Sequence, residues 1–292
     1  MDKRRLGGLF AIVFAVVLWG VSFVSTKIVL SYMGPLFLAF LRFAVGLVVI
    51  FPFLLLKRLS IRVSSKDMLF LAMGGITGVT LYFYFENTGL VYMPASDASL
   101  IVAFIPVISA IIESLVYKKK LYPSDNAGII LSMWGVYFVV REGLRLTSSP
   151  IGYVLMVLAA LSWIAYSFLS RPFSGKINGL VMVFWHFFWG TLAFLPFLHF
   201  EPLKIMNFSF SFWFNFLFLS VGCSALAYIA YQHALSVLGV TVSNVFINLI
   251  PFITVLTAVI FLEESFTVMK AIGGVLIITG LYLTTGYKKK KY

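Results

Sequence analysis

Long apolar runs separated by short polar segments fill the chain from end to end. Ten of them are long enough to cross the roughly 30 Å core of a bilayer as helices, which takes about 20 residues each. They cover about 7–30, 35–56, 68–87, 95–117, 126–141, 151–169, 178–199, 211–234, 241–262 and 270–287. Because the runs lack the alternation of a membrane barrel, each must satisfy its backbone hydrogen bonds as a helix. The pattern predicts an all-α polytopic membrane protein with ten transmembrane helices.

The composition excludes a water-soluble globule. Hydrophobic residues make up 61% of the 292 residues and charged residues 11%, whereas a soluble domain has about 25% charged residues. The single cysteine and three histidines argue against a metal centre or a thiol enzyme, and the sequence has no phosphate-binding loop or hydrolase motif. We therefore expect no enzyme, no cofactor and no metal.

The distribution of lysine and arginine predicts the topology. If the N-terminus is inside, 16 of these residues lie in inner loops and tails and only 4 in outer loops. The outer four are Arg141, Arg145, Lys204 and Lys270. The positive-inside rule then places both termini in the cytoplasm of a multi-pass protein of the cell inner (plasma) membrane. The net charge of +12 indicates attraction to anionic membrane lipid rather than to nucleic acid.

The chain also contains an internal repeat of five helices. An offset of 144 residues superposes Trp19 on Trp163 and Arg42 on His186, and an offset of 145 superposes Pro106 on Pro251. The other matched positions are Lys27 with Arg171, Gly46 with Gly190, Pro52 with Pro196, Leu90 with Leu235, Gly128 with Gly273 and Gly135 with Gly280. An odd number of spans inverts the second copy, so we predict repeats at 1–146 and 147–292 of opposite orientation. Inverted repeats with a site at their interface are typical of transporters.

Several of these segments resemble the EamA-type branch of the drug/metabolite transporter superfamily. The segments are Leu18-Trp19-Gly20, Ser162-Trp163, Gln232-His233-Ala234-Leu235, Asn248-Leu249-Ile250-Pro251, Leu262-Glu263-Glu264 and Gly273-Gly274. The resemblance extends over about residues 8–285. It implies a carrier, more often an exporter than an importer, and leaves the cargo open because the family has many substrates.

Polar side chains within the spans are the candidate site, because charge inside a bilayer is costly. Trp19 and Ser22 share one helix face, and Trp163 and Tyr166 share the equivalent face of the sixth span. The remaining candidates for substrate binding are Lys27, Arg42, Tyr82, Glu86, His186, Asn244 and Asn248. Pro106 and Pro251 are expected to bend their helices, which suits a moving gate.

Two alternatives remain open for the central charges. Glu86 could bind a substrate ammonium or exchange a proton, or it could pair with Lys27 or Arg42 as an outer gate. His186 could carry a proton or be an interior histidine held by hydrogen bonds. The second half has no carboxylate at the matching position, because Tyr231 stands where the first half has Glu86.

These residues favour a secondary transporter that works by alternating access on small polar or amphiphilic metabolites. Amino acid export is the narrower hypothesis, with Lys27 and Arg42 receiving a carboxylate, Glu86 an ammonium, and the aromatic residues an apolar side chain. Protons are a candidate coupling ion. The alternatives are a broad-specificity drug or metabolite exporter and, less favoured, a channel.

Overall fold

The structure of the protein is a computed structural model that describes residues 3–117, 122–146, 148–173, 176–201 and 209–286. Seven of its helices are long and apolar enough to cross a membrane: Lys3–Leu30, Pro35–Leu56, Ser65–Val91, Pro123–Leu146, Pro150–Ser170, Gly179–Leu198 and Phe210–Leu238. Three shorter apolar helices lie at Ala95–Ser109, Ile250–Leu262 and Val268–Leu283. The all-helical membrane class is thus confirmed, while the count of ten spans and the inverted repeat remain predictions.

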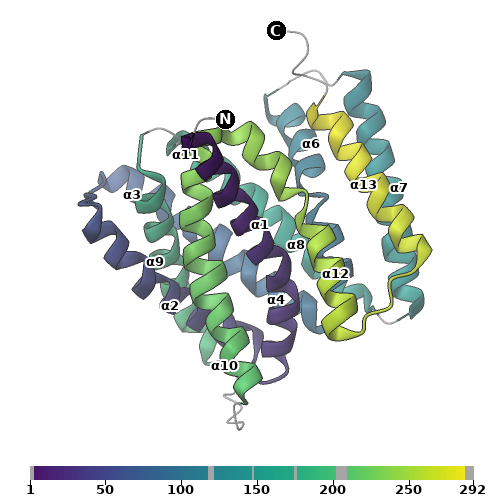
Figure 1. The fold of residues 1–292 in the computed structure, drawn as a ribbon, viewed down its shortest axis with the longest axis horizontal. Helices are drawn as coiled ribbons and strands as arrows, with labels where there is room; N and C mark the ends of the chain where they lie inside the picture. The colour runs from purple at the N-terminus through teal and green to yellow at the C-terminus, as the bar shows by residue number, and fades with distance from the viewer. Residues whose placement is uncertain (1–2, 118–121, 147, 174–175, 202–208, 287–292) are drawn as a thin grey trace.

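The elements run along the chain in the order labelled in Figure 1. Those of the first half are α1 (Lys3–Leu30), α2 (Pro35–Leu56), α3 (Ser65–Gly75), η1 (Ile76–Leu81), α4 (Tyr82–Val91), α5 (Ala95–Val102), α6 (Ile105–Tyr117) and α7 (Pro123–Leu146). Those of the second half are α8 (Pro150–Ser170), η2 (Arg171–Phe173), α9 (Gly179–Leu198), α10 (Phe210–Leu217), η3 (Phe218–Leu226), α11 (Ala227–Ile247), α12 (Ile250–Leu262) and α13 (Val268–Gly286).

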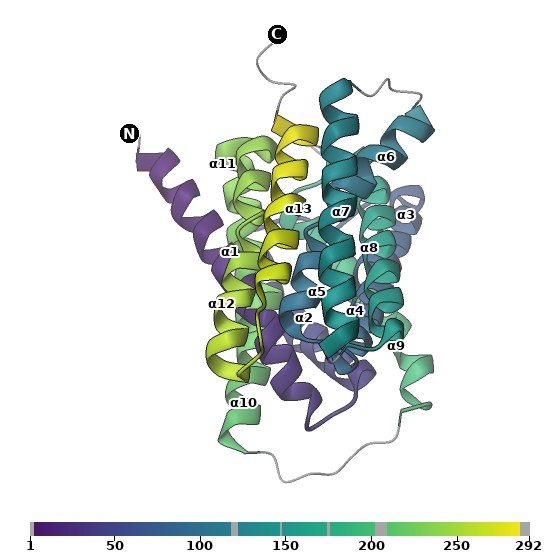
Figure 2. The ribbon, with the colours of Figure 1, turned by 90° about the vertical axis from the view of Figure 1, so that its right-hand side faces the viewer.

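The helix ends gather at two opposite ends of the bundle. The ends next to the loops that the charge pattern places outside lie together, away from both termini (Figures 1 and 2). We call this the outer end and the end bearing the termini the inner end. The names follow the predicted orientation.

Two prolines interrupt their helices at equivalent places. A proline ring clashes with the carbonyl four residues earlier, which is Val102 for Pro106 and Ile247 for Pro251, and α5 and α11 end at those two residues. This corrects a predicted boundary, because α11 continues through the expected loop at 235–240 as far as Ile247. A lone glycine in that stretch, Gly239, weakens a helix by only about 1 kcal/mol and does not end it.

The third and eighth predicted spans each contain a stretch of π-helix that the sequence pattern did not indicate. These stretches, η1 and η3, occupy equivalent positions in the repeat. In η1 the Thr80 hydroxyl donates to the carbonyl of Gly190 on α9, at 2.8 Å. Wide helical turns of this kind are frequent at functional sites, and both stretches lie against the interior.

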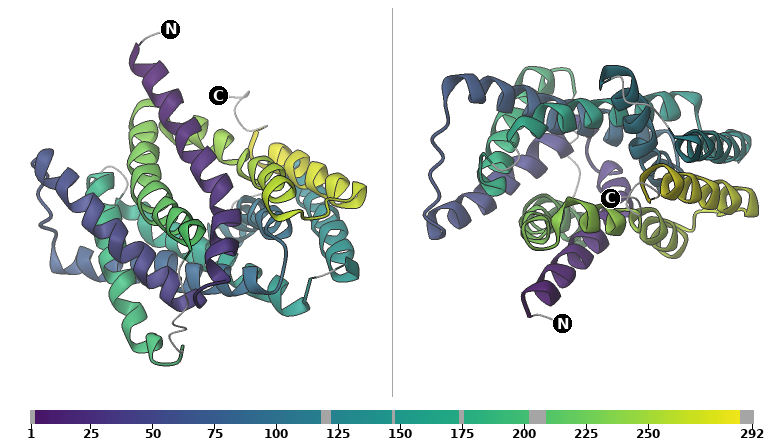
Figure 3. Two further views of the ribbon diagram at one scale, coloured as in Figure 1. Left: turned by 60° about the horizontal axis from the view of Figure 1, so that its bottom comes forward. Right: turned by 90° about the horizontal axis from the view of Figure 1, so that it is seen from above.

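The two halves are interleaved rather than side by side. The first helix, α1, packs on α11 and α12 of the second half, and α8 packs on α4 and α5 of the first. Figure 3 shows the same interleaving from two further directions. Helices α7 and α13 meet through glycines, since a Cβ on Gly135 would lie 2.5 Å from the carbonyl oxygen of Gly273. The halves therefore share one interior.

Candidate functional site

Arg42 on α2 and Glu86 on α4 are buried charges in the interior. Their exposed fractions are 3% and 7%. The Arg42 Nε donates to the Ser224 hydroxyl at 2.7 Å, and its guanidinium carbon lies 4.6 Å from the centre of the Phe83 ring, a cation–π distance. Arg42 is thus held by η3 of the second half and by an aromatic face.

Glu86 is left comparatively free beside this arginine. Within the described residues its carboxylate accepts one long hydrogen bond, from the Tyr82 hydroxyl at 3.3 Å. Glu86 is close enough to Arg42 for their charges to interact, yet in this part of the chain the two do not form a direct ion pair. The site therefore presents a carboxyl group and a guanidinium group that are not in direct contact.

Aromatic side chains from both halves surround these charges. On one side Tyr82, Trp163, Tyr166 and His186 form a chain with successive ring centres 5.0 Å apart. On the other side Trp19 lies 5.3 Å from Tyr228 and 5.2 Å from Tyr231. The side chains of Trp19, Trp163, Tyr166 and Tyr231 are only half-buried although they face neighbouring helices. Each of these four residues therefore keeps part of its surface exposed.

His186 lies at the end of this aromatic chain against α3. It is 2% exposed, and a Cβ on Gly74 would come within 2.7 Å of its Nε2, so only glycine leaves room for the ring. Among the residues that the structure describes, the Nδ1 atom of His186 has no hydrogen-bond partner. A buried and unpartnered ring nitrogen is unusual and leaves a proton acceptor or donor available in the interior.

Lys27 is not part of this cluster. Its ammonium donates to the Met93 carbonyl at 2.6 Å and lies 3.7 Å from the Glu264 carboxylate, at the outer end. The suggestion that Glu86 pairs with Lys27 is therefore wrong, because Glu264, on the loop before α13, takes that place. The Ser22 hydroxyl donates to the Trp19 carbonyl at 2.7 Å, so it is bonded within its own helix.

Asn244 and Asn248 are the two candidate asparagines near Pro251. Asn248 is half-buried at the interruption between α11 and α12. The side chain of Asn244 lies outside the described part of the chain. The interruptions before Pro106 and Pro251 place a change of helix direction in each half, and their role as gates remains a prediction.

Sequence reasoning missed several contributors to the site. Phe83, Ser224 and Tyr228 hold Arg42 and Trp19 in place but were not singled out. A signal was present for Tyr228, because it lies three residues before Tyr231 on one helix face and stands at the offset that matches Phe83. Ser224 gave no such signal, since small hydroxyl residues are common in ordinary helix seams.

Comparison with known proteins decides the family. The EamA-like transporter family matches the chain twice, over residues 6–141 and 150–286. The chain belongs to this family. A similar relative is an uncharacterized transporter of Archaeoglobus fulgidus, 31% identical over 279 residues, which are 92% of this chain and 93% of the relative.

Two further likenesses exist at lower identity. A probable terminal-alkyne amino-acid exporter of Streptantibioticus cattleyicolor is 24% identical over 279 residues, covering 94% of this chain and 92% of that protein. A crystal structure superposes with a TM-score of 0.65 at 22% identity, over 97% of this chain and 98% of the other. The first names a transporter with a stated cargo class, and the second shows that the fold is shared. As a member of the EamA-like family the protein is a transporter and not an enzyme.

Proposed function

We propose that this EamA-like transporter exports amino acids or closely related metabolites across the plasma membrane by alternating access. The observation that carries the proposal is the pair of buried charges, Arg42 and Glu86, which lie between aromatic walls from both halves without contacting each other. A zwitterion offers a carboxylate to the arginine and an ammonium to the glutamate, and an apolar side chain to the rings. Few polar groups in an apolar cavity are what fixes orientation and specificity in small-molecule sites.

Family and chemistry support the same cargo class. One relative carries the name of a probable amino-acid exporter, which supports the proposal at low identity. The charge bias of the loops supports cytoplasmic termini. Glu86 and His186 are the groups available for proton coupling, because each is buried and has at least one oxygen or nitrogen that no partner among the described residues holds.

Counterflow in proteoliposomes tests this proposal. Vesicles are preloaded with a mixed amino-acid pool, and the entry of each labelled amino acid is followed with and without a pH gradient. We expect saturable entry of one class. Glu86→Gln should lower that entry by roughly ten- to a hundredfold, since a hydrogen bond to a charged group contributes about 1.5–3 kcal/mol. The matched control is Glu263→Gln, which removes the same charge from an exposed position.

Either of two results would contradict the proposal. Normal transport by Glu86→Gln with unchanged pH dependence would remove Glu86 from binding and coupling. Absence of counterflow for every amino acid, in protein that is shown to be folded, would favour a broad-specificity exporter. That second candidate draws on the aromatic character of the walls, where rings outnumber charges. Steady single-channel current would instead identify a channel.

A further inference from the structure

A buried ion pair joins the two halves at the outer end. The Lys270 ammonium on α13 lies 2.6 Å from the Asp97 carboxylate on α5, and the two side chains are 1% and 0% exposed. The other oxygen of Asp97 accepts hydrogen bonds from Tyr153 at 2.9 Å and Ser148 at 3.1 Å. Asp97 thus ties the first turn of α5 to α8 and α13. The charge count assigned Lys270 to an outer loop, whereas the structure places it, buried, in the first turn of α13.

Glu264 holds the same helix end from the preceding loop. Its carboxylate accepts from the backbone N–H groups of Ala95 at 2.7 Å and Ser96 at 3.0 Å, and from the Ser96 hydroxyl at 2.7 Å. A carboxylate is well placed there, because the N-terminus of a helix carries partial positive charge. Glu264 and Lys270 therefore hold the start of α5 by two charged groups.

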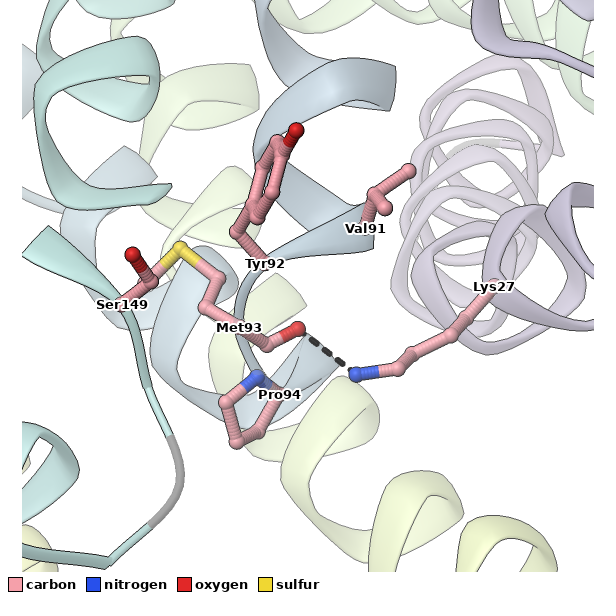
Figure 4. Close-up of a pocket in the computed structure, with 6 residues that line it drawn as sticks. All are labelled: Lys27, Val91, Tyr92, Met93, Pro94 and Ser149. Atoms are coloured by element: carbon pink, nitrogen blue, oxygen red, sulfur yellow. Dashed lines mark hydrogen bonds between the residues drawn. The ribbon is translucent and has the colours of Figure 1, made fainter. Parts of the chain in front are cut away.

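Lys27 links α1 to this arrangement. Figure 4 shows its ammonium reaching the Met93 carbonyl, beside a pocket of about 330 Å³ that is bordered by Tyr92, Pro94 and Ser149. The same ammonium lies 3.7 Å from Glu264. We call Lys27, Asp97, Glu264 and Lys270 the outer latch. Each of its ion pairs joins a residue before 146 to a residue after 147.

The repeat offsets match the outer latch to a different set of charges. Lys27 corresponds to Arg171 and Glu264 to Lys119, so a cation and an anion are replaced by two cations. Asp97 corresponds to Val242 and Lys270 to Asp125, so the second pair loses one of its charges. Both residue pairs of the outer latch combine opposite charges. Of the two matched pairs, one has two cations and the other has a single charge.

One pair of matched residues, Thr26 and Ser170, also differs in burial between the two ends. Thr26, next to Lys27 at the outer end of α1, is 3% exposed. Its counterpart at an offset of 144 is Ser170, at the inner end of α8, which is half-buried. Ser170 keeps some exposed surface although its hydroxyl oxygen is buried, whereas Thr26 is buried almost completely.

We propose that the outer latch holds the outer end of the carrier closed, and that its two ion pairs must break before the protein opens to the outside. The latch residues are positioning residues: they set the balance between the two open states and do not touch the cargo. The inference needs only that the protein is a carrier, so it stands or falls independently of the amino-acid hypothesis.

Site-directed thiol labelling tests the outer latch without any cargo. Cys223→Ser removes the single native thiol, whose described hydrogen bond, to the Leu18 carbonyl, a serine can also make. Thr26→Cys and Ser170→Cys, in separate chains, then report the outer and inner ends at equivalent positions. A membrane-impermeant maleimide is applied to vesicles of both orientations, and labelling rates are compared with and without Glu264→Gln.

We expect Glu264→Gln to raise labelling of the Thr26→Cys reporter from the outside by about tenfold and to lower labelling of the Ser170→Cys reporter from the inside. A shift of this size corresponds to the loss of one favourable ion pair with its hydrogen bonds. The control is Glu263→Gln, whose exposed carboxylate is one residue away, and it should change neither rate. The double variant Asp97→Asn with Lys270→Met should act like Glu264→Gln without leaving a buried unpaired charge.

Three results would overturn the outer latch. Equal labelling in Glu264→Gln and Glu263→Gln would show that the carboxylate does not hold the end closed. A rise at both reporters would show general loosening of the fold. A rise at the Thr26→Cys reporter only from the side bearing the termini would contradict its assignment to the outer end.

Discussion

The outer and inner ends of this EamA-like transporter are built from equivalent helix termini that are held in different ways. At the outer end the N-terminus of α2 receives a carboxylate from the other half, because Glu201 accepts from Leu36 at 3.3 Å and Phe37 at 2.8 Å. The equivalent helix at the inner end, α9, is capped by its own Asn178, which accepts from Leu180 at 2.9 Å. The N-terminus of α2 is thus capped by a residue of the other half, whereas that of α9 is capped by the residue directly before it.

Single residues explain the difference between these two caps. Asn178 corresponds to Gly34, which has no side chain to cap with, and a Cβ on Gly34 would collide with the Glu201 carboxylate. Glu201 itself corresponds to Lys57, at the inner end. A lysine cannot accept a hydrogen bond from a backbone N–H. The matched positions thus lie at the ends of similar helices, α2 and α9, but differ in side chain and in charge.

If the chain is the predicted inverted duplication, its two copies give two packings of similar energy, and a small charge difference is enough to choose between them. In the described part of the chain, contacts across the outer end include carboxylates and ammonium groups, beside neutral ones such as the Tyr32 and Ser209 hydroxyls at 2.8 Å. An inner contact between the halves is neutral, from the Trp185 indole N–H to the Ile61 carbonyl at 3.0 Å.

The largest effect is expected for Lys270→Met alone. This change leaves Asp97 buried without its cation, and breaking a buried pair from one side costs about 3–5 kcal/mol. The thermal unfolding midpoint in detergent should fall sharply, and adding Asp97→Asn should recover most of the loss. The inner counterpart is Asp125→Asn, at a helix start where the Asp125 carboxylate accepts from the Tyr122 N–H, and loss of such a cap costs about 1 kcal/mol. Equal losses in Lys270→Met and the double variant would show that the loss does not come from the unpaired Asp97 charge.

The contrast between the ends could be predicted from sequence only in part. Hydropathy predicted the all-helical membrane class, and the offsets matched Pro106 with Pro251, before which α5 and α11 both end. The ion pairs could not be found in this way, because Lys270 and Glu264 read as loop charges until the three-dimensional structure brings α13 to α5. A charged residue at a solvent-exposed helix end costs little free energy, so the sequence alone does not indicate that Lys270 is buried.

The central site was more accessible to sequence reasoning. Arg42, Glu86 and the paired tryptophans stood out because polar and aromatic groups at helical spacing are rare in apolar spans. Their partners did not stand out. Ser224, which accepts from Arg42, lies in η3, and hydrophobic periodicity does not distinguish a π-turn from an α-turn. Lys27 fitted the same pattern but is taken by Glu264.

An intermediate effect is expected when the attractive pair is copied to the inner end. Lys119→Glu introduces a carboxylate at the position that the offset matches to Glu264, while Arg171 already matches Lys27. If the ends differ by charge alone, labelling of the Ser170→Cys reporter should fall by about two- to fivefold, the value of an exposed ion pair. Labelling of the Thr26→Cys reporter should rise. Lys119→Gln serves as the control, since it removes the cation without adding an anion, and a matching fall in that control would assign the effect to lost repulsion.

The smallest effect is expected at the two caps. Glu201→Gln weakens the contact with the α2 N-terminus by about 0.5–1 kcal/mol, so labelling of the Thr26→Cys reporter should rise by about two- to fivefold. Asn178→Ala removes a cap of similar value, about 1 kcal/mol, but from within α9. Asn178→Ala should lower the unfolding midpoint about as much as Glu201→Gln does. It should leave the labelling rates of both reporters unchanged, because the Asn178 cap does not join α9 to another segment. If Asn178→Ala shifted labelling as far as Glu201→Gln, the ends would differ in local helix stability and not in what joins the two halves.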